Sequence, residues 1–257
     1  MPPASHDFAS KLDALDLSLF DAVASQSTDG DRRSWLAVQR AIRRPSGYTY
    51  LEIGSHLGGS IQQHLVDPYC RRIVSIDRRP LSQPDDRGFV ARYEENSTAR
   101  MLDNLRRVSP EVVGKIVCFD LDARDVDPAR IPEPADFCFI DGEHTHASVL
   151  SDFEFCLKVS SPNAAICFHD ALVLYRSIAE VMSSLRARGV PFHARKLGGS
   201  TFGLFLRECR ALDDPYLTLS QDGSRWIRGR RIRGWLPREM RPAARWVARR
   251  LRAAKTS

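Results

Sequence analysis

The chain has 257 residues, of which 43% are hydrophobic and 27% charged, with a formal net charge of +6. This length suffices for one sizeable α/β domain, and no apolar run approaches the roughly eighteen residues that a transmembrane helix needs. The N-terminus has acidic residues where a secretory signal carries positive charge, so we expect a cytoplasmic protein. The six cysteines include no CxxC pair and support neither a disulfide framework nor a zinc knuckle.

Residues 1–44 are predicted to form an N-terminal helical extension, with Trp35, Val38 and Ile42 on one apolar face. Beyond them, up to residue 209, short apolar runs alternate with helical patterns. The runs predict strands at 49–54, 72–77, 115–121, 135–141, 164–170, 191–197 and 201–207. Apolar residues at helical spacing lie between them, within 101–108, 149–157 and 178–185.

Strands that alternate with helices indicate a doubly wound, mostly parallel sheet covered on both faces. Only "GGS" joins the last two of the seven strands, which is too short for a crossover and predicts a C-terminal antiparallel hairpin. We therefore expect a Rossmann-like α/β domain over residues 45–209.

The first strand runs into the glycine loop "YLEIGSHLGGSI", with glycines at 54, 58 and 59. It lacks the spacing of the dinucleotide fingerprint, because His56 stands where a glycine belongs. It also lacks the lysine of a P-loop, since Ser60 occupies that position. The remaining interpretations are a tight strand-to-helix turn without a ligand, or a loop that lets a ligand approach the backbone.

Acidic residues at the next two strand ends favour the ligand. Asp77 follows the loop by about twenty residues, where a carboxylate can accept hydrogen bonds from ribose hydroxyls. The third strand ends at "DLDARD", where Asp122 and Ala123 are expected to flank an adenine. Asp77 alone would also fit a turn residue paired with Arg78 or Arg79. Together these features describe an adenosyl ligand across the strand ends.

At this point the chain resembles a family. "EIGSHLGGS", "SIDRRP", "DLDARD" and the terminal hairpin are similar to the class I S-adenosylmethionine-dependent methyltransferases, over about residues 45–207. The resemblance implies that S-adenosyl-L-methionine is the cofactor and that Asp77 holds its ribose. The methionyl part would contact Glu52 and the loop, which the following residues complete: Gly54, Ser55, His56, Gly58 and Ser60.

The fourth and fifth strands end in a second group of ionisable residues. Asp141 closes one, and His169 and Asp170 close the other, so their side chains should converge beside the glycine loop. Neighbouring carboxylates suit a hard divalent cation. His144, one short turn beyond Asp141, has a side chain able to accept the proton of an acceptor hydroxyl.

"FIDGEHTHASVLSDFEFC" and "AAICFHD" further resemble metal-dependent sugar O-methyltransferases of the macrolide-glycoside type. By matching position, Asp141 and Asp170 would be metal ligands, and His144 with Asp141 would form the catalytic pair. His169 replaces a glutamate of that family; as a third ligand it would favour Mn²⁺ over the otherwise expected Mg²⁺. The alternative is that His169 points away.

Several nearby residues are given structural interpretations. His146 is expected to be solvated on the first helical turn, and Glu143 and Asp152 to be solvated as well. For His56, cofactor contact and helix capping remain equally open.

The net charge is unevenly distributed along the chain. Residues 225–257 hold twelve Lys or Arg and one acidic residue, which leaves residues 1–224 with 26 basic and 31 acidic, a net of −5. Ala243, Val247 and Leu251 recur every four positions, which predicts a cationic amphipathic helix. Residues 210–257 are therefore expected to be a linker and a basic tail that contacts an acidic protein surface or the inner face of a membrane. Nucleic-acid binding is not expected, because no recognisable module is present.

These patterns predict a metal-dependent O-methyltransferase, expected to be a homodimer, that acts on a hydroxyl of a small carbohydrate or glycoside. Two alternatives stay open: methylation of a catechol or phenol, and a non-catalytic cofactor-binding assembly subunit.

Overall fold

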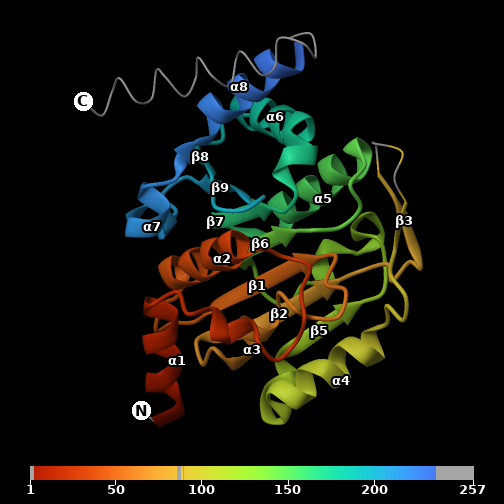
Figure 1. The fold of residues 1–257 in the computed structure, drawn as a ribbon, viewed down its shortest axis with the longest axis vertical. Coiled ribbons are helices and arrows are strands. Elements are labelled where there is room, and N and C mark those ends of the chain that lie inside the picture. Colours follow the sequence, from red (N-terminus) through yellow and green to blue (C-terminus); the bar gives the residue numbers. More distant parts are fainter. Residues whose placement is uncertain (1–2, 86–87, 89, 236–257) are drawn as a thin grey trace.

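A single twisted sheet forms the centre of the molecule (Figure 1). The structure, a computed structural model, describes residues 3–85, 88 and 90–235. The sheet has the strand order β10-β8-β9-β7-β6-β1-β2-β5. Its strands are β1 (Tyr48–Ile53), β2 (Cys70–Ile76), β5 (Ile116–Phe119), β6 (Ala135–Ile140), β7 (Ser160–Phe168), β8 (Phe192–Lys196), β9 (Phe202–Leu206) and β10 (Gln221–Asp222).

The pairing confirms the expected fold. β5, β2, β1, β6 and β7 pair in parallel, whereas β9 runs antiparallel to both β7 and β8. All seven predicted strands are present, with ends that differ from the prediction by a few residues. The short β10 adds an eighth strand, antiparallel to β8, inside the segment that was expected to be a linker.

A second, two-stranded sheet was not predicted. β3 (Ser82–Pro84) pairs antiparallel with β4 (Val90–Arg92) in the connection between β2 and the next helix. These strands have three residues each and their residues are partly or fully exposed, so they lack the buried apolar run that identifies the central strands. The hairpin lies beside the C-terminal edge of the large sheet, where its Asp85 forms an isolated bridge with His144.

Helices cover both faces of the sheet, and each face has its own hydrophobic core. The first face packs against α1 (Pro3–Asp13), α2 (Asp29–Ile42), α3 (Gln62–Val66), α4 (Thr98–Val108) and α7 (Pro215–Thr218). The second face packs against α5 (His146–Val159), α6 (Ala171–Ala187) and α8 (Gly223–Trp235). Side chains of β1 alternate between the two, with Tyr50 in the first core and Leu51 in the second.

The two ends of the chain extend this layered domain. Trp35, Val38 and Ile42, the predicted apolar face of the N-terminal extension, are buried against the sheet. At the other end, α8 lies beside α6 and β8 (Figure 1). The predicted amphipathic segment 243–252 lies outside the described residues. Of the helices in the described ranges, none has the length and apolar character that crossing a bilayer requires.

Candidate active site

The glycine loop brings two strand ends into direct contact. Gly54 has a φ of +91°, and a Cβ on it would lie 2.2 Å from the carbonyl oxygen of Asp141. Any side chain at this position would push the ends of β1 and β6 apart, so the glycine is required for both its conformation and the close approach. The same approach places the loop directly beside the side chains that follow β6.

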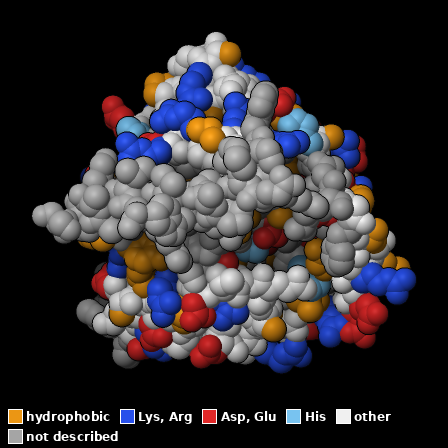
Figure 2. Space-filling view, turned by 45° about the horizontal axis from the view of Figure 1, so that its top comes forward, with side chains coloured by type: hydrophobic (Ala, Val, Ile, Leu, Met, Phe, Trp, Pro, Cys, Tyr) orange, Lys and Arg blue, Asp and Glu red, His pale blue; other side chains and the backbone are white. Residues whose placement is uncertain are grey.

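A cavity opens above this contact. Its floor is the glycine loop, one wall is the N-terminal segment 24–27, and the other wall comes from the β3–β4 hairpin and the residues after it. Acidic and histidine side chains lie together in a hollow on the face drawn in Figure 2. The functional groups that line the cavity belong to Ser25, Gln26, Ser27, Trp35, Ser55, His56, Ser60, Asp77, Gln83, Tyr93, Asn96, Asp141, His144, His169 and Asp170.

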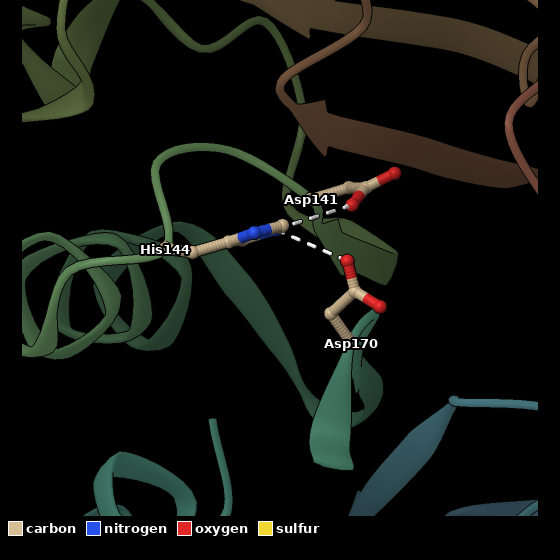
Figure 3. Close-up of side chains that lie close together, drawn as sticks. All are labelled: Asp141, His144 and Asp170. Carbon is tan, nitrogen blue, oxygen red and sulfur yellow. Dashed lines mark ion pairs between the residues drawn. The ribbon is translucent and has the colours of Figure 1, made fainter. Parts of the chain in front are cut away.

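Three of these side chains form a compact cluster (Figure 3). Nε2 of His144 lies 3.5 Å from Oδ2 of Asp170 and 4.0 Å from Oδ1 of Asp141. One donor atom from each residue lies within 4.8 Å of the others. Asp141 follows β6, Asp170 follows β7 in the left-handed conformation (φ 46°), and His144 comes from the loop before α5. The predicted convergence of strand ends is thus present in the structure.

His169, the predicted third ligand, borders the cluster, with its Nδ1 3.9 Å from Oδ2 of Asp170. Its Nδ1 lies 3.0 Å from Oδ1 of Asp141, and its Nε2 faces Oδ2 of Asp31 at 3.6 Å. The imidazole is buried between these carboxylates, with the edge of Trp35 against it. The three donor atoms that gather at one point include His144. Nδ1 of His169 contacts Asp141 beside them, and its role as a metal ligand stays a prediction.

Asp31 anchors this arrangement from the N-terminal extension. It is almost fully buried and closes the capping box of α2 with Thr28. Its Oδ1 also accepts hydrogen bonds from the Ser200 amide at 2.7 Å and the Thr201 hydroxyl at 2.9 Å. Asp31 thus connects α2, the β8–β9 turn and His169.

The side chains of the cluster strongly influence one another's pKa. Burial acts to raise the pKa of Asp141, but His169 and His144 beside it hold it below its usual range. Burial acts to lower the pKa of both histidines, but Asp141 and the other carboxylates outweigh it, raising the pKa of His144 and taking that of His169 to about 11. The two histidines therefore stabilise the negative charge of Asp141.

Asp85 approaches His144 from the opposite side. Its Oδ2 lies 3.7 Å from Nδ1 of His144, so the imidazole has a carboxylate beside each of its ring nitrogens. Asp85 belongs to the β3–β4 hairpin. No local pattern predicts this contact, because the hairpin itself was not predicted.

The residues predicted to hold the methionyl part fall into two groups. Ser55, His56 and Ser60 line the cavity with Gly54, whereas Glu52 and Gly58 lie behind the loop. Glu52 is fully buried and accepts hydrogen bonds from the hydroxyls of Tyr50 and Ser60. Burial raises its pKa to about 8. Glu52 therefore shapes the loop through Ser60.

Asp77 connects the main cavity to a second, smaller one. Its carboxylate accepts hydrogen bonds from the amide of His56 at 2.8 Å and the amide of Arg79 at 2.7 Å. Both cavities include Gly54, Asp77 and Gln83 in their linings. The second cavity extends to the predicted adenine neighbours Asp122 and Ala123. The two cavities therefore lie side by side along the strand ends, where the ligand was predicted.

The expectations for three neighbouring residues differ in outcome. His146 opens α5 with 44% of its side chain exposed, and its Nδ1 lies 2.8 Å from the Ser177 hydroxyl. Glu143 was expected to be solvated, but it is mostly buried and pairs with Arg78 at 2.8 Å. Asp152 was also expected to be solvated, and that prediction is wrong because α5 packs this side chain against the loop after β5.

The chain is similar to known methyltransferases over part of its length. The family model of a methyltransferase domain matches residues 51–171. Similar solved structures include the O-methyltransferase TomG from Streptomyces achromogenes, involved in tomaymycin synthesis and in complex with SAM; it is 19% identical over 80% of this chain and 90% of that chain, with a TM-score of 0.46. Another is an O-methyltransferase from Bacillus cereus in complex with SAH, 17% identical over 80% of this chain and 91% of that chain, with a TM-score of 0.45.

No curated protein matches the chain. The fold rests on the strand order and pairing described above, and the similarity to a methyltransferase domain extends over residues 51–171.

Proposed function

We propose that the protein transfers a methyl group from S-adenosylmethionine to a carbohydrate hydroxyl. The proposal proceeds from the similarity of residues 51–171 to a methyltransferase domain and from the strand order of the sheet. The observation that carries the proposal is the cluster of Asp141, His144 and Asp170 in the cavity above the glycine loop. In this proposal the donor lies along the β1 and β2 ends and the acceptor oxygen lies at the cluster.

The paired cavities support the position of the donor. A ligand that spans them would pass Asp77, whose carboxylate can accept from ribose hydroxyls. The sulfonium end would then lie over the loop, beside Asp141. Methyl transfer is a displacement at an activated carbon, so the residues at this end need to align the reactants and do not have to activate the donor.

The cluster also fits a divalent cation. Asp141 and Asp170 offer carboxylate oxygens from adjacent strand ends, and oxygen ligands suit Mg²⁺ or Mn²⁺. A bound cation supplies charge stabilisation for the oxygen of the acceptor as it loses its proton. His169 fits the role of a supporting group, because its Nδ1 fixes one oxygen of Asp141.

His144 is the proposed base. Asp85 faces its Nδ1 at 3.7 Å, an arrangement that favours the proton on Nδ1 and leaves the lone pair on Nε2. Nε2 is directed at the cluster, where the acceptor hydroxyl would lie. The neighbouring carboxylates raise the pKa of His144, so activity should increase as the pH rises and the imidazole becomes neutral.

The walls of the larger cavity favour a sugar over a catechol. Hydroxyl and amide side chains predominate, from Ser25, Gln26, Ser27, Gln83 and Asn96. Such groups can exchange hydrogen bonds with several sugar hydroxyls. Trp35 and Tyr93 are the aromatic members of the lining in the described residues, and they do not form the continuous aromatic walls that would favour a flat phenolic acceptor.

The test is a labelled-methyl transfer screen over mono- and oligosaccharides, with a catechol arm, in Mg²⁺, Mn²⁺ or chelator. We expect transfer to a carbohydrate that the chelator abolishes and Mg²⁺ or Mn²⁺ restores. Transfer to the catechol alone would contradict a carbohydrate acceptor and indicate a phenolic one. Full activity in chelator would contradict a role for the cation.

Two variants then separate the roles of His144. His144→Ala should lose transfer while it keeps binding of S-adenosylhomocysteine and of Mn²⁺, and His193→Ala, on the exposed side of β8, should behave as wild type. Loss of Mn²⁺ binding in His144→Ala would make His144 a ligand, and full turnover would contradict its role as the base.

A further inference from the structure

A buried carboxylate lies at the back of the smaller cavity. Asp152, on α5, has only 5% of its surface exposed, although an aspartate on a helix is ordinarily solvated. Its Oδ2 lies 3.3 Å from the point where a Cβ on Gly142 would lie, and both residues line the cavity. The side chain is therefore directed at the space between the β6 end and the loop after β5.

This carboxylate lacks a partner. Within the part of the chain that the structure describes, no hydrogen bond or ion pair reaches it. Burial, with Asp122 and Glu143 nearby, raises its pKa to about 7. A buried polar group without a partner destabilises a protein unless a ligand or water satisfies it.

Asp122, the acid predicted to flank the adenine, already has hydrogen-bond partners. The carboxylate of Asp122 accepts from Nη2 of Arg124 at 2.8 Å, Nε at 3.0 Å and the Arg124 amide at 3.1 Å. Asp122 therefore forms the cap of its own turn, which leaves Asp152 as the unsatisfied acid of this cavity.

The shape and lining of the cavity indicate a flat ring with a polar edge. Ile53, Ile76, Leu121 and Ala123 provide apolar walls, and the ion pair of Arg78 and Glu143 lies at the rim. The opposite end joins the larger cavity at Asp77. A purine would enter with its ring between the apolar walls and its far edge toward Asp152.

We infer that Asp152 recognises the adenine of the donor by accepting a hydrogen bond from its exocyclic amino group. This rests on the proposed function, because it takes S-adenosylmethionine as the ligand. A neutral carboxyl can in addition donate to the adjacent ring nitrogen, so adenine satisfies either protonation state. Hypoxanthine places a carbonyl oxygen at the same point, which an ionised carboxylate repels.

The test measures binding of S-adenosylhomocysteine and of its deaminated analogue S-inosylhomocysteine by calorimetry, at about pH 8.5, where a carboxyl of pKa about 7 is ionised. Wild type should prefer the adenosyl ligand by about tenfold or more, since a buried polar mismatch costs more than 1 kcal/mol. Asp152→Leu should weaken adenosyl binding by about tenfold and lose the preference.

Asp152→Asn keeps the test decisive if the leucine variant fails to fold. The amide oxygen still accepts from adenine, and its amino group can donate to the hypoxanthine carbonyl. Affinity for S-adenosylhomocysteine should stay within about threefold while the preference collapses. Asp125→Asn, on the same loop but exposed, should match wild type in both.

The possible failures are distinguishable. Wild type that binds neither ligand would overturn the proposed function together with this inference. Wild type that binds S-adenosylhomocysteine, with the preference unchanged in Asp152→Asn or Asp152→Leu, would overturn the role of Asp152 alone.

Discussion

Acidic side chains lie on the proposed donor and acceptor ends of the site, and their surroundings shift their pKa in opposite directions. On the proposed donor end, Glu52 lies beneath the glycine loop and Asp152 lies at the back of the smaller cavity. Neither has a cationic partner in contact, and burial raises their pKa to about 8 and about 7. At the acceptor end, Asp141 and Asp31 lie against His169, and the pKa of each carboxyl is lowered although burial opposes this.

Burial alone therefore does not decide the charge of an acid in this protein. All four carboxylates are largely enclosed, and the presence of an imidazole within about 3–4 Å separates the two pairs. The two acids without an imidazole therefore release their protons only near or above neutral pH. The acceptor end keeps its negative charge, as suits a cation.

The largest expected effect comes from neutralising the acceptor end. Asp141→Asn keeps the side-chain volume but removes the charge, and we expect methyl transfer to fall about a thousandfold, because charge stabilisation by a bound metal is worth several kcal/mol. Labelled transfer under saturating Mg²⁺ measures this, with Asp103→Asn on the exposed face of α4 as control. Turnover near wild type would show that the negative charge at this end is dispensable.

Removing the imidazole between two acids should cost stability. His169→Leu leaves Asp31 buried and uncompensated, and we expect the free energy of unfolding to fall by about 3 kcal/mol. Because folding raises the pKa of His169, its stabilisation in the metal-free protein is complete below pH 6.5 and is lost as the pH rises towards 11.

Denaturant titrations at pH 6 and pH 9 check this, and the difference between wild type and His169→Leu should shrink at the higher pH. We also expect His169→Leu to bind Mn²⁺ more weakly, because Asp141 loses the contact that supports it. His169→Gln, which can still donate to Asp141, should recover part of that affinity. An equal loss in both variants would argue against this contact as the support of Asp141.

The donor end gives a smaller effect with a defined pH window. Glu52 takes up a proton on folding, so its contribution is present below pH 4.5 and is lost as the pH rises to about 8. Glu52→Gln should remove a slope of up to about 1.4 kcal/mol per pH unit within that window. Melting curves from pH 5 to pH 8 measure the slope against wild type and against exposed Glu208→Gln; parallel curves for all three would contradict a buried, protonated Glu52.

The smallest effect is expected at Asp85, whose carboxylate lies 3.7 Å from His144. Asp85 helps to raise the pKa of His144, so Asp85→Asn should move the acidic limb of the pH–rate profile to lower pH. The maximal rate should fall only about threefold, because the partial exposure of His144 weakens the interaction. A shift of the acidic limb to higher pH would contradict the proposal that Asp85 raises the pKa of His144.

The sequence predicted the sheet well for a physical reason. Each central strand is a short apolar run closed by an acid or a glycine, so both its position and its functional end can be read locally. The convergence of Asp141 with Asp170 follows from the same rule, because parallel strands present their carboxyl ends at one edge.

The rest of the site depends on contacts that no local pattern carries. Thr28 and Asp31 have the spacing of a capping box, which predicts a helix start but not the approach to His169. Asp152 was misjudged because its residue type indicates exposure, whereas the packing of α5 against the loop after β5 encloses it. The hairpin that brings Asp85 to His144 has too few apolar residues to be recognised.

The contact between Gly54 and the Asp141 backbone has a consequence for redesigning the acceptor range. In the proposed function it joins the donor and acceptor sides of the site, and it leaves no room for a side chain at position 54. Gln26 and Ser27 of the N-terminal segment and Gln83 of β3 line the same hollow without taking part in that contact. A library confined to those two segments would vary the recruited alcohol and leave the transfer geometry intact.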